Sequence, residues 1–332
     1  MADFLTGAFQ LPRTAPFVQP ALMQWKYDDP RPDWNGSRSY AWMEGGRIAA
    51  HACLCPVTYR AENREITGSY LIDWAALRLS PGAGVFLLRK LSSLFQVLWA
   101  IGGSQDTQTI LPKLGYQAAG ELSLFARVMR PWRQSRNDPA RRGWKAPLRL
   151  ARNTLLSRLP AASIPAHWTC TPLPAFDSGH IPLLQAVTPH PTTQRTPELM
   201  NYFLRCPGAK MSAYVIREKG VPRGWFVISR VAGVSRIADF RLHSAAPDAW
   251  QAGYGLALKM ALGDREGCEL IAAATTPLAA QAIRRNGFRL RSTQPVFLLD
   301  PGKLLLPHLP LEVNLIESDA AYLYDPQYPY LT

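Results

Sequence analysis

The sequence LRLSPGAGVFLLRKL, residues 77–91, places a Gly-x-Gly just before a run of apolar residues at helical spacing, which continues through Phe95 to Leu98. It is followed by WAIGGSQDTQTILPKLGYQ, residues 99–117, which predicts a short buried strand and a second helix closed by Gly-Tyr. The same order returns in WQAGYGLALKMAL, residues 250–262, and LIAAATTPLAAQAIRRNGFR, residues 270–289. The chain therefore carries one pattern of glycines, strand and helices twice.

The spacing between matching landmarks is nearly constant along the two copies. Gly84 and Gly255 are 171 positions apart and Gly115 and Gly287 are 172 apart, as are two alanines in strands that precede a glycine turn, Ala41 and Ala213. Because the landmarks differ in local chemistry, the constant offset predicts duplication of a whole domain.

The repeated unit resembles the acyl-CoA N-acyltransferase fold of the GNAT superfamily. In that fold a strand ends in a Gly-x-Gly loop that starts a helix, and the next strand leads to a helix closed by Gly-aromatic, as KLGYQ and RNGFR stand here. The resemblance covers roughly residues 38–129 and 166–300. It implies the α/β (α+β) class, with two tandem domains, each a mixed, mostly antiparallel central sheet flanked by helices.

The length of 332 residues suits two domains of ordinary size. We expect a first, cofactor-binding domain over 1–129, a basic connector over 130–165, a second, degenerate domain over 166–300 and a proline-rich extended tail over 301–332. The first domain lacks an evident first strand. Hairpins are predicted from Tyr40 to Tyr59 and across MSAYVIREKGVPRGWFVISRV, and buried strands in ITGSYLIDWAALRL and SRIADFRL.

The composition, 47% hydrophobic and 18% charged, is that of a packed globular protein. There is no run of 18 apolar residues, and the start MADFLTGAFQ has no basic segment before an apolar core, which predicts a cytoplasmic protein. The five cysteines contain no CxxC pair, so reduced thiols are expected.

Most of the net charge of +13 lies in the connector. Residues 130–158 hold nine Lys and Arg against one acidic residue, whereas both domains are nearly balanced, so no nucleic-acid partner is expected. After an exposed loop, a basic amphipathic helix is predicted from Pro147 to Pro160. A solvated helix between domains is favoured; weak contact of residues 144–158 with an anionic membrane, through Lys145, Arg149 and Arg152, is the alternative.

The resemblance implies a site for acetyl-CoA or another acyl-CoA in the first repeat. The loop N–H groups and the helix N-terminus would hold the pyrophosphate, because glycine lets the backbone approach closely. The matching residues are Leu77, Leu79, Ser80, Gly82, Ala83, Gly84 and Val85. Leu79 stands where the family has Arg or Gln; a tight strand-to-helix turn without cofactor is the alternative. In the second copy the helix could begin at Pro247 and run through both glycines, which predicts a degenerate site.

Acyl transfer to an amine needs a base, and the resemblance places an acid on the strand before the loop. Asp73 fits that position, and a buried structural acid is equally compatible with the sequence. Asp239 is the counterpart in the second copy. The tyrosine that serves as acid in other members is absent, because Leu111 stands in its place. Tyr116, Tyr322 or Tyr324 could supply the missing hydroxyl.

The acceptor is expected between the repeats, near Trp25, Tyr27 and His51, although core packing also explains the aromatic residues. His51, Cys53 and Cys55 share one strand face by period two, but a structural zinc needs a fourth ligand, so no metal is expected.

The predicted function is transfer of an acetyl or other acyl group from acyl-CoA to an amine of a small molecule or amino sugar. The alternatives are an aminoacyl-transferase-like enzyme of cell-envelope synthesis and a catalytically degenerate scaffold. The sequence does not indicate an oligomeric state.

Overall fold

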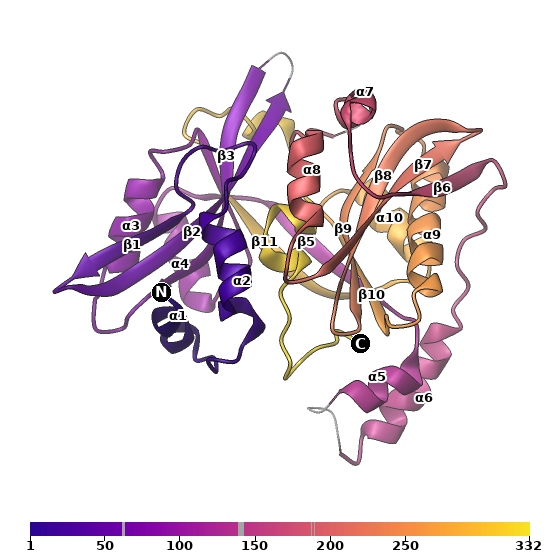
Figure 1. Cartoon of the computed structure of the whole chain (residues 1–332), viewed down its shortest axis with the longest axis horizontal. Coiled ribbons are helices and arrows are strands. Elements are labelled where there is room, and N and C mark those ends of the chain that lie inside the picture. Colours follow the sequence, from indigo (N-terminus) through magenta and orange to yellow (C-terminus); the bar gives the residue numbers. More distant parts are fainter. Residues whose placement is uncertain (62–63, 139–142, 187, 189) are drawn as a thin grey trace.

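The structure, a computed structural model, describes the chain except for residues 62–63, 139–142, 187 and 189, so part of the predicted connector lies outside it. One eleven-stranded sheet runs in the order β1-β2-β3-β4-β11-β5-β10-β9-β8-β7-β6 (Figure 1). The strands are β1 (Ser39–Glu44), β2 (Arg47–Ala61), β3 (Arg64–Ala76), β4 (Val97–Ile101), β5 (Gln117–Val128), β6 (Trp168–Leu173), β7 (Lys210–Glu218), β8 (Val221–Val231), β9 (Val234–Leu242), β10 (Glu269–Ala274) and β11 (Arg289–Leu299).

The α-helices are α1 (Ala2–Phe9), α2 (Pro20–Met23), α3 (Ala83–Leu91), α4 (Gln105–Lys113), α5 (Pro131–Asn137), α6 (Ala146–Ser157), α7 (Ile181–Leu184), α8 (Pro197–Leu204), α9 (Pro247–Gly263) and α10 (Pro277–Arg285). A π-helical turn, η2 (Gln24–Asp28), follows α2, and two 3-10 turns of the tail, η6 (Leu315–Glu317) and η7 (Asp319–Ala321), matter below. Among the described residues, no helix is long and apolar enough to cross a membrane.

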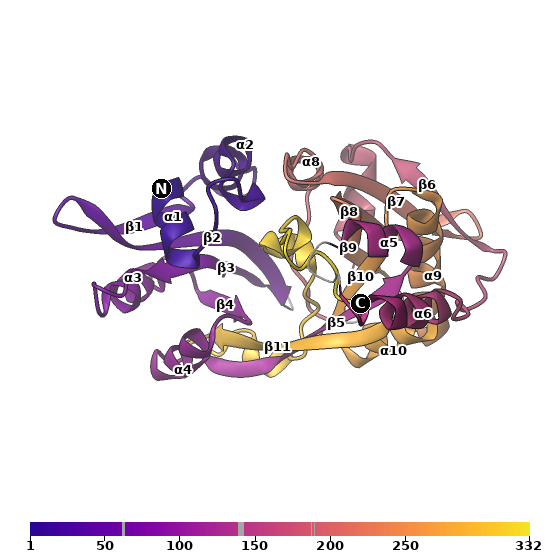
Figure 2. The ribbon, with the colours of Figure 1, turned by 90° about the horizontal axis from the view of Figure 1, so that it is seen from below.

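The last strand of each repeat pairs with the other repeat. β11 runs antiparallel to β4, with Val296–Leu299 opposite 98–101, and β5 runs antiparallel to β10. The two exchanged strands also pair with each other, so they lie side by side across the middle of the molecule (Figure 2). The repeats thus share one continuous sheet, and neither sheet half is complete without a strand from the other repeat.

The two faces of the sheet carry different cores. Residues of α3 and α4 pack on one face of the first repeat, and residues of α9 and α10 pack on the second repeat. The other face carries residues of α2, α7 and α8 together with the tail, in a single core that spans both repeats. As predicted, the first repeat has no strand equivalent to β6 among its described residues.

Both hairpins and both buried strands are confirmed, but several boundaries differ from the predictions. β3 ends at Ala76 instead of continuing to Leu79, and α3 ends at Leu91 although the apolar spacing continues into β4. The predicted exposed loop of the connector contains α5, which Pro131 begins, while the predicted helix is present as α6. The helix α8 was not predicted.

The pairing of Gly84 with Gly255 as equivalent landmarks is wrong. Gly84 lies in the first turn of α3, whereas α9 begins at Pro247 and runs through Gly255 without interruption, which was the alternative for this copy. By contrast, Gly115 and Gly287 both follow a helix with positive φ, at +91° and +78°. This backbone conformation favours glycine and explains why the Gly-aromatic motif repeats.

Candidate functional site

The parallel strands of the first repeat pair over only three residues. Gly68–Tyr70 of β3 pair with Val97–Trp99 of β4, and β3 then continues to Ala76 paired with β2 but not with β4. A Cβ on Gly68 would lie 2.6 Å from Val97 Cγ2, so glycine permits this close start before the strands separate. We call the separated part the first splay; in the second repeat, β9 and β10 likewise pair only from Val234 to Arg236.

A β-bulge turns β3 where the first splay begins. The pairing of β2 with β3 shifts between His51 and Cys53, and Asp73 has a φ of +51°. A bulge inserts a residue and re-aims a side chain, and such positions recur next to active sites. The alternation of side chains along β3 therefore breaks at Asp73 itself.

The turn after β3 leads into a helix N-terminus that has no capping side chain. Leu77 N–H donates to Ala49 O at 2.8 Å, and Ala83 N–H donates to Ser80 O at 3.2 Å. Gly82, with a φ of +88°, is the N-cap of α3, and the first turn holds no acidic residue. This geometry suits an anion, since first-turn N–H groups and the helix dipole point toward it.

The predicted cofactor residues differ in their surroundings. Ala83 and Gly84 are buried, Ser80 and Val85 are partly exposed, and Leu79 is 94% exposed. Leu77 and Leu79 lie in the turn and not at the strand end. Arg78, in the same turn, is exposed, so it could attract phosphate although its position was not predicted.

Gly84 packs α3 against β3, and its predicted contact to phosphate, which would use its N–H, stays a prediction. A Cβ there would lie 3.2 Å from both Trp74 Nε1 and the Ala76 Cβ, inside the molecule. Trp74 Nε1 donates to Gly84 O at 3.0 Å, which fastens α3 to β3. The lack of a side chain at Gly84 therefore sets how close the helix lies to the strand.

Asp73 lies in a buried group of charges. Its Oδ2 is 2.5 Å from Lys26 Nζ and accepts a hydrogen bond from Tyr27 Oη at 2.7 Å. Lys26 Nζ also lies 3.3 Å from Asp319 Oδ2, so a carboxylate from the tail completes the group. The π-helical turn η2 brings Lys26 and Tyr27 to the same acid, and π-turns are frequent at functional sites.

The acidic and basic members of this group influence each other. Burial lowers the pKa of Lys26, but Asp73 and Asp319 raise this pKa more, so the ammonium stays charged. Burial raises the pKa of Asp319 to about 6, although Lys26 opposes that shift. Burial, followed by the charge of Asp73, raises the pKa of Tyr27. Asp319 therefore gains and loses a proton close to neutral pH.

His51 is fully buried beside this group. Its Nδ1 lies 3.2 Å from Asp73 O, and since a carbonyl only accepts, Nδ1 carries the proton. Burial lowers the pKa of His51, so the ring is neutral near pH 7 and its Nε2 accepts from Ser39 Oγ at 2.9 Å. The structure thus brings Asp73, Tyr27 and His51 together.

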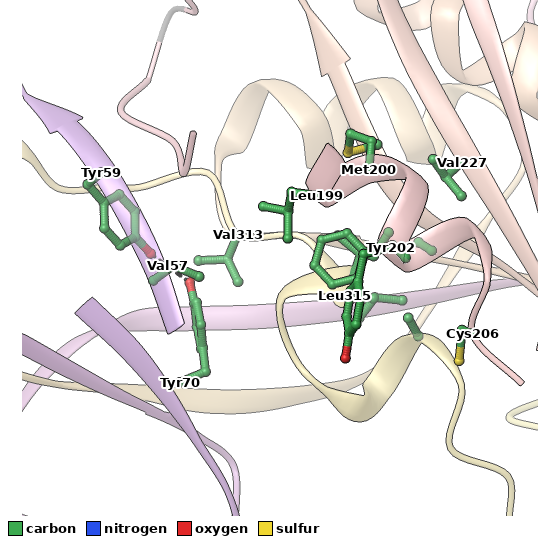
Figure 3. Packing of buried hydrophobic residues seen from close by; sticks show 14 of the residues in the cluster. Val57, Tyr59, Tyr70, Leu199, Met200, Tyr202, Cys206, Val227, Val313 and Leu315 are labelled. Atoms are coloured by element: carbon green, nitrogen blue, oxygen red, sulfur yellow. Dashed lines mark hydrogen bonds between the residues drawn. The ribbon is translucent and has the colours of Figure 1, made fainter. Parts of the chain in front are cut away.

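Trp25 lies away from them, where the repeats meet. It stacks on Tyr202 with ring centroids 4.9 Å apart. Figure 3 shows this region filled by buried side chains of both repeats and of the tail. The prediction of an acceptor groove between the repeats is therefore wrong at Trp25, because a packed core lies there.

A cavity of about 440 Å³ lies instead beside Tyr27 and Ser39, lined by residues 27–31 and 34–39.

The second repeat has a matching charge group. Arg195 Nη2 lies 3.1 Å from Asp239 Oδ1 and 2.9 Å from Glu317 Oε1, and Trp225 Nε1 donates to Asp239 at 2.9 Å. Burial would raise the pKa of Asp239, but the nearby arginines lower it. In both repeats a strand acid pairs with one cation, and the tail adds a second carboxylate, Glu317 here and Asp319 in the first repeat.

The tail fills the second splay. Asn314 Oδ1 accepts from Phe240 N–H on β9 at 3.1 Å. Thr275, just after β10, donates to Leu311 O at 2.6 Å and accepts from Val313 N–H at 3.1 Å. Among the residues that the structure describes, no hydrogen bond of the tail reaches residues 72–76 of β3. The strand edge beyond the parallel pairing is thus bonded to the tail in the second repeat and, within the described residues, free of tail hydrogen bonds in the first.

The first repeat fits an acyl-CoA. It combines an edge of β3 that the tail leaves free with an uncapped helix N-terminus behind Gly82. Its turn also carries the exposed Arg78.

In the described part of the chain, no group of three or more His, Cys, Asp and Glu side chains is placed to hold a metal. Cys53 is buried and Cys55 partly so, and both are free thiols.

Comparison with known proteins identifies the fold. The chain is similar to a GCN5-related N-acetyltransferase from Anabaena variabilis (12% identity, 90% of this chain and 69% of that chain, TM-score 0.57). It is equally similar to Saccharomyces cerevisiae N-myristoyltransferase with bound myristoyl-CoA and inhibitors (12% identity, 90% of this chain and 76% of that chain, TM-score 0.57). A tandem GNAT protein from the clavulanic acid biosynthesis pathway matches over 91% of this chain and 94% of its own (13% identity, TM-score 0.53).

No protein-family model and no curated protein matches the chain. The structural likenesses establish that this chain has the GNAT fold in a tandem, two-domain arrangement.

Sequence reasoning missed the partners of both strand acids. Neither Lys26 nor Arg195 was predicted to pair with these acids, and Glu317 and Asp319 were not singled out. The tail acids lie more than two hundred positions from Lys26, so no local spacing signals the contact. The available signal was the presence of acids, including Glu312, Glu317 and Asp319, among the apolar residues of the tail.

Proposed function

We propose that this protein is an acyltransferase that moves an acetyl or other acyl group from acyl-CoA to an amine, with the cosubstrate held in the first repeat. The observation that carries the proposal is the difference between the splays. Both repeats separate their parallel strands, yet only the second covers the strand edge with the tail. Acyl-CoA, when bound, supplies the activated acyl group as a thioester.

The binding residues follow from the geometry of the first splay. The edge of β3 beyond Asp73 would pair with the pantetheine arm. The first-turn amides of α3, behind Gly82, would bind pyrophosphate, with Arg78 adding positive charge. Trp74 keeps α3 in place through its bond to Gly84 O.

We further propose the Asp73 and Asp319 carboxylates as the base. They share Lys26, which keeps at least one of them ionised, and the pKa of Asp319 near 6 suits a group that accepts a proton near neutral pH. Tyr27 donates a hydrogen bond to Asp73 and also lines the cavity of about 440 Å³, so it connects the two carboxylates to that cavity. That cavity is our candidate entry for the acceptor, and Asp28 and Asp29 in its wall favour a protonated amine.

Thermal-shift titration with acetyl-CoA, followed by transfer assays on polyamines and amino sugars, tests the proposal. We expect the melting temperature to rise with ligand concentration. An Asp73→Asn variant should keep this rise and lose turnover. No shift up to millimolar acetyl-CoA, in an assay where a known acetyltransferase responds, would reject the enzyme and favour a scaffold.

A further inference from the structure

The connector hairpin of α5 and α6 carries an apolar stripe that faces away from the protein. The hairpin projects from one end of the sheet (Figure 1). Trp144, two residues before α6, is 79% exposed, and Leu148 and Leu155 on α6 are 66% and 68% exposed. Ala151 lies between them and is also exposed. Spacings of three and four place these side chains on one face of the helix.

Buried hydrogen bonds fix which face of α6 points outward. Asn153 Nδ2 donates to Gln134 Oε1 on α5 at 3.0 Å. Gln134 Nε2 in turn donates to Thr332 Oγ1 at 2.6 Å and to Glu269 Oε2 on β10 at 3.3 Å. Asn153 and Gln134 are each 3% exposed. Rotating α6 to hide its apolar stripe would break this chain of bonds, so the exposed stripe is a built feature.

The charge around the stripe has one sign. Residues 130–158 hold nine basic residues and one acid, and that acid, Asp138, is 4% exposed. Lys145 and Arg158 are exposed at the two ends of α6, and Lys145 Nζ lies 5.0 Å from the centre of the Trp144 ring. An apolar stripe with a tryptophan, flanked by basic residues, has the chemistry of a helix that lies in the interface of an anionic bilayer.

We propose that α6 docks on an anionic lipid surface, with Trp144, Leu148 and Leu155 inserted and Lys145 and Arg158 against the headgroups. The helix lies in the plane of the interface. Nucleic acid fits less well, because phosphates would leave the apolar stripe between them without a partner. Surface attachment of this kind would bring the enzyme to acceptors or acyl chains at a membrane.

Co-sedimentation of the full chain with vesicles tests the proposal. The vesicles contain phosphatidylcholine alone or with one third phosphatidylserine. We expect binding only to the anionic vesicles, weakened by added salt. Leu148→Ser with Leu155→Ser should weaken binding roughly tenfold or more, and Lys145→Gln with Arg158→Gln should do the same, since each basic residue contributes roughly fivefold.

Two matched variants control for nonspecific changes. Val221→Ser with Leu290→Ser removes apolar side chains that are 51% and 44% exposed, and Arg205→Gln with Lys210→Gln removes two exposed charges elsewhere. Both should bind like the unmodified chain. The proposal is overturned if anionic vesicles are not bound, if the controls weaken binding equally, or if the serine pair has no effect while the chain binds DNA as tightly as vesicles.

Discussion

The side-chain oxygen of Asn314 accepts a hydrogen bond from the backbone N–H of Phe240 at 3.1 Å. Phe240 lies on β9 beyond the point where β9 stops pairing with β10. The bond therefore seats the tail of the chain on the strand edge that stays free in the first repeat. Both repeats contain a bulged strand and a separation of their parallel strands, so this contact contributes to the chemical difference between the two splays.

Asn314→Ala should lower the free energy of unfolding by about 1–3 kcal/mol, because it leaves the Phe240 N–H without an acceptor. Denaturant unfolding measures this change, and Gln327→Ala, at an exposed tail position, is the control. Acetyl-CoA affinity should not change, because the bond lies in the second repeat. An effect no larger than that of the control would show that the tail is loosely held.

Lys26→Met should destabilise the protein by about 3–5 kcal/mol, because Asp73 and Asp319 would remain buried without their cation. Adding Asp319→Asn to Lys26→Met should restore part of the loss, since one of the two carboxylates is then neutral. Urea unfolding of the single and double variants measures both effects. If the double variant is less stable than the single one, Asp319 contributes through contacts other than the shared charge.

Glu312 should make stability fall as the pH rises. Burial raises its pKa to about 8, and its Oε2 has no hydrogen-bond partner among the described residues. Between its ordinary pKa, near 4.5, and 8, the folded state holds a proton that the unfolded state has lost, so this group destabilises the fold progressively. Glu312→Gln should remove the effect, with a relative gain on the order of 2–4 kcal/mol from about pH 5 to about pH 9. Parallel melting curves for both proteins that keep a constant separation over this range would contradict the assignment.

Gly255→Ala should destabilise the protein, which reverses what helix propensity alone predicts. A Cβ at Gly255 would lie 3.0 Å from Ile164 Cγ1 and 3.1 Å from Asn286 Oδ1. The cost of this overpacking exceeds the gain of about 1 kcal/mol from replacing a helical glycine. In a double-mutant cycle with Ile164→Ala, the two substitutions should be less harmful together than their sum. Additive effects would mean that Ile164 moves aside without cost.

The tandem fold could be predicted from the sequence because its signals are local. A buried strand and a Gly-aromatic helix end each depend on backbone conformation over a few residues, and the chain repeats both. The same locality explains the errors at α3 and β3, where apolar spacing continues past the true ends. The reason for glycine at position 84 was also hidden, because only the packing of Trp74 against α3 shows what that glycine accommodates.

The site could be predicted only in part. Asp73, Tyr27 and His51 were singled out, and the structure brings them together; their roles remain predictions. The pairing of Lys26 with Asp319 could not be predicted, because it depends on where the tail, 293 positions further along the chain, returns. The exchange of β5 and β11 between the repeats was equally hidden, since each strand has the same pattern whichever partner it pairs with.

Calorimetric titration of the chain with acetyl-CoA tests the central claim most directly. One molecule should bind per chain, and Gly82→Val, which strains a residue with a φ of +88°, should abolish binding. Gly46→Val imposes similar strain at a φ of +77° in the exposed turn between β1 and β2, so it should leave binding intact. Two molecules bound per chain, or binding that survives Gly82→Val at full strength, would contradict a single acyl-CoA site in the first repeat.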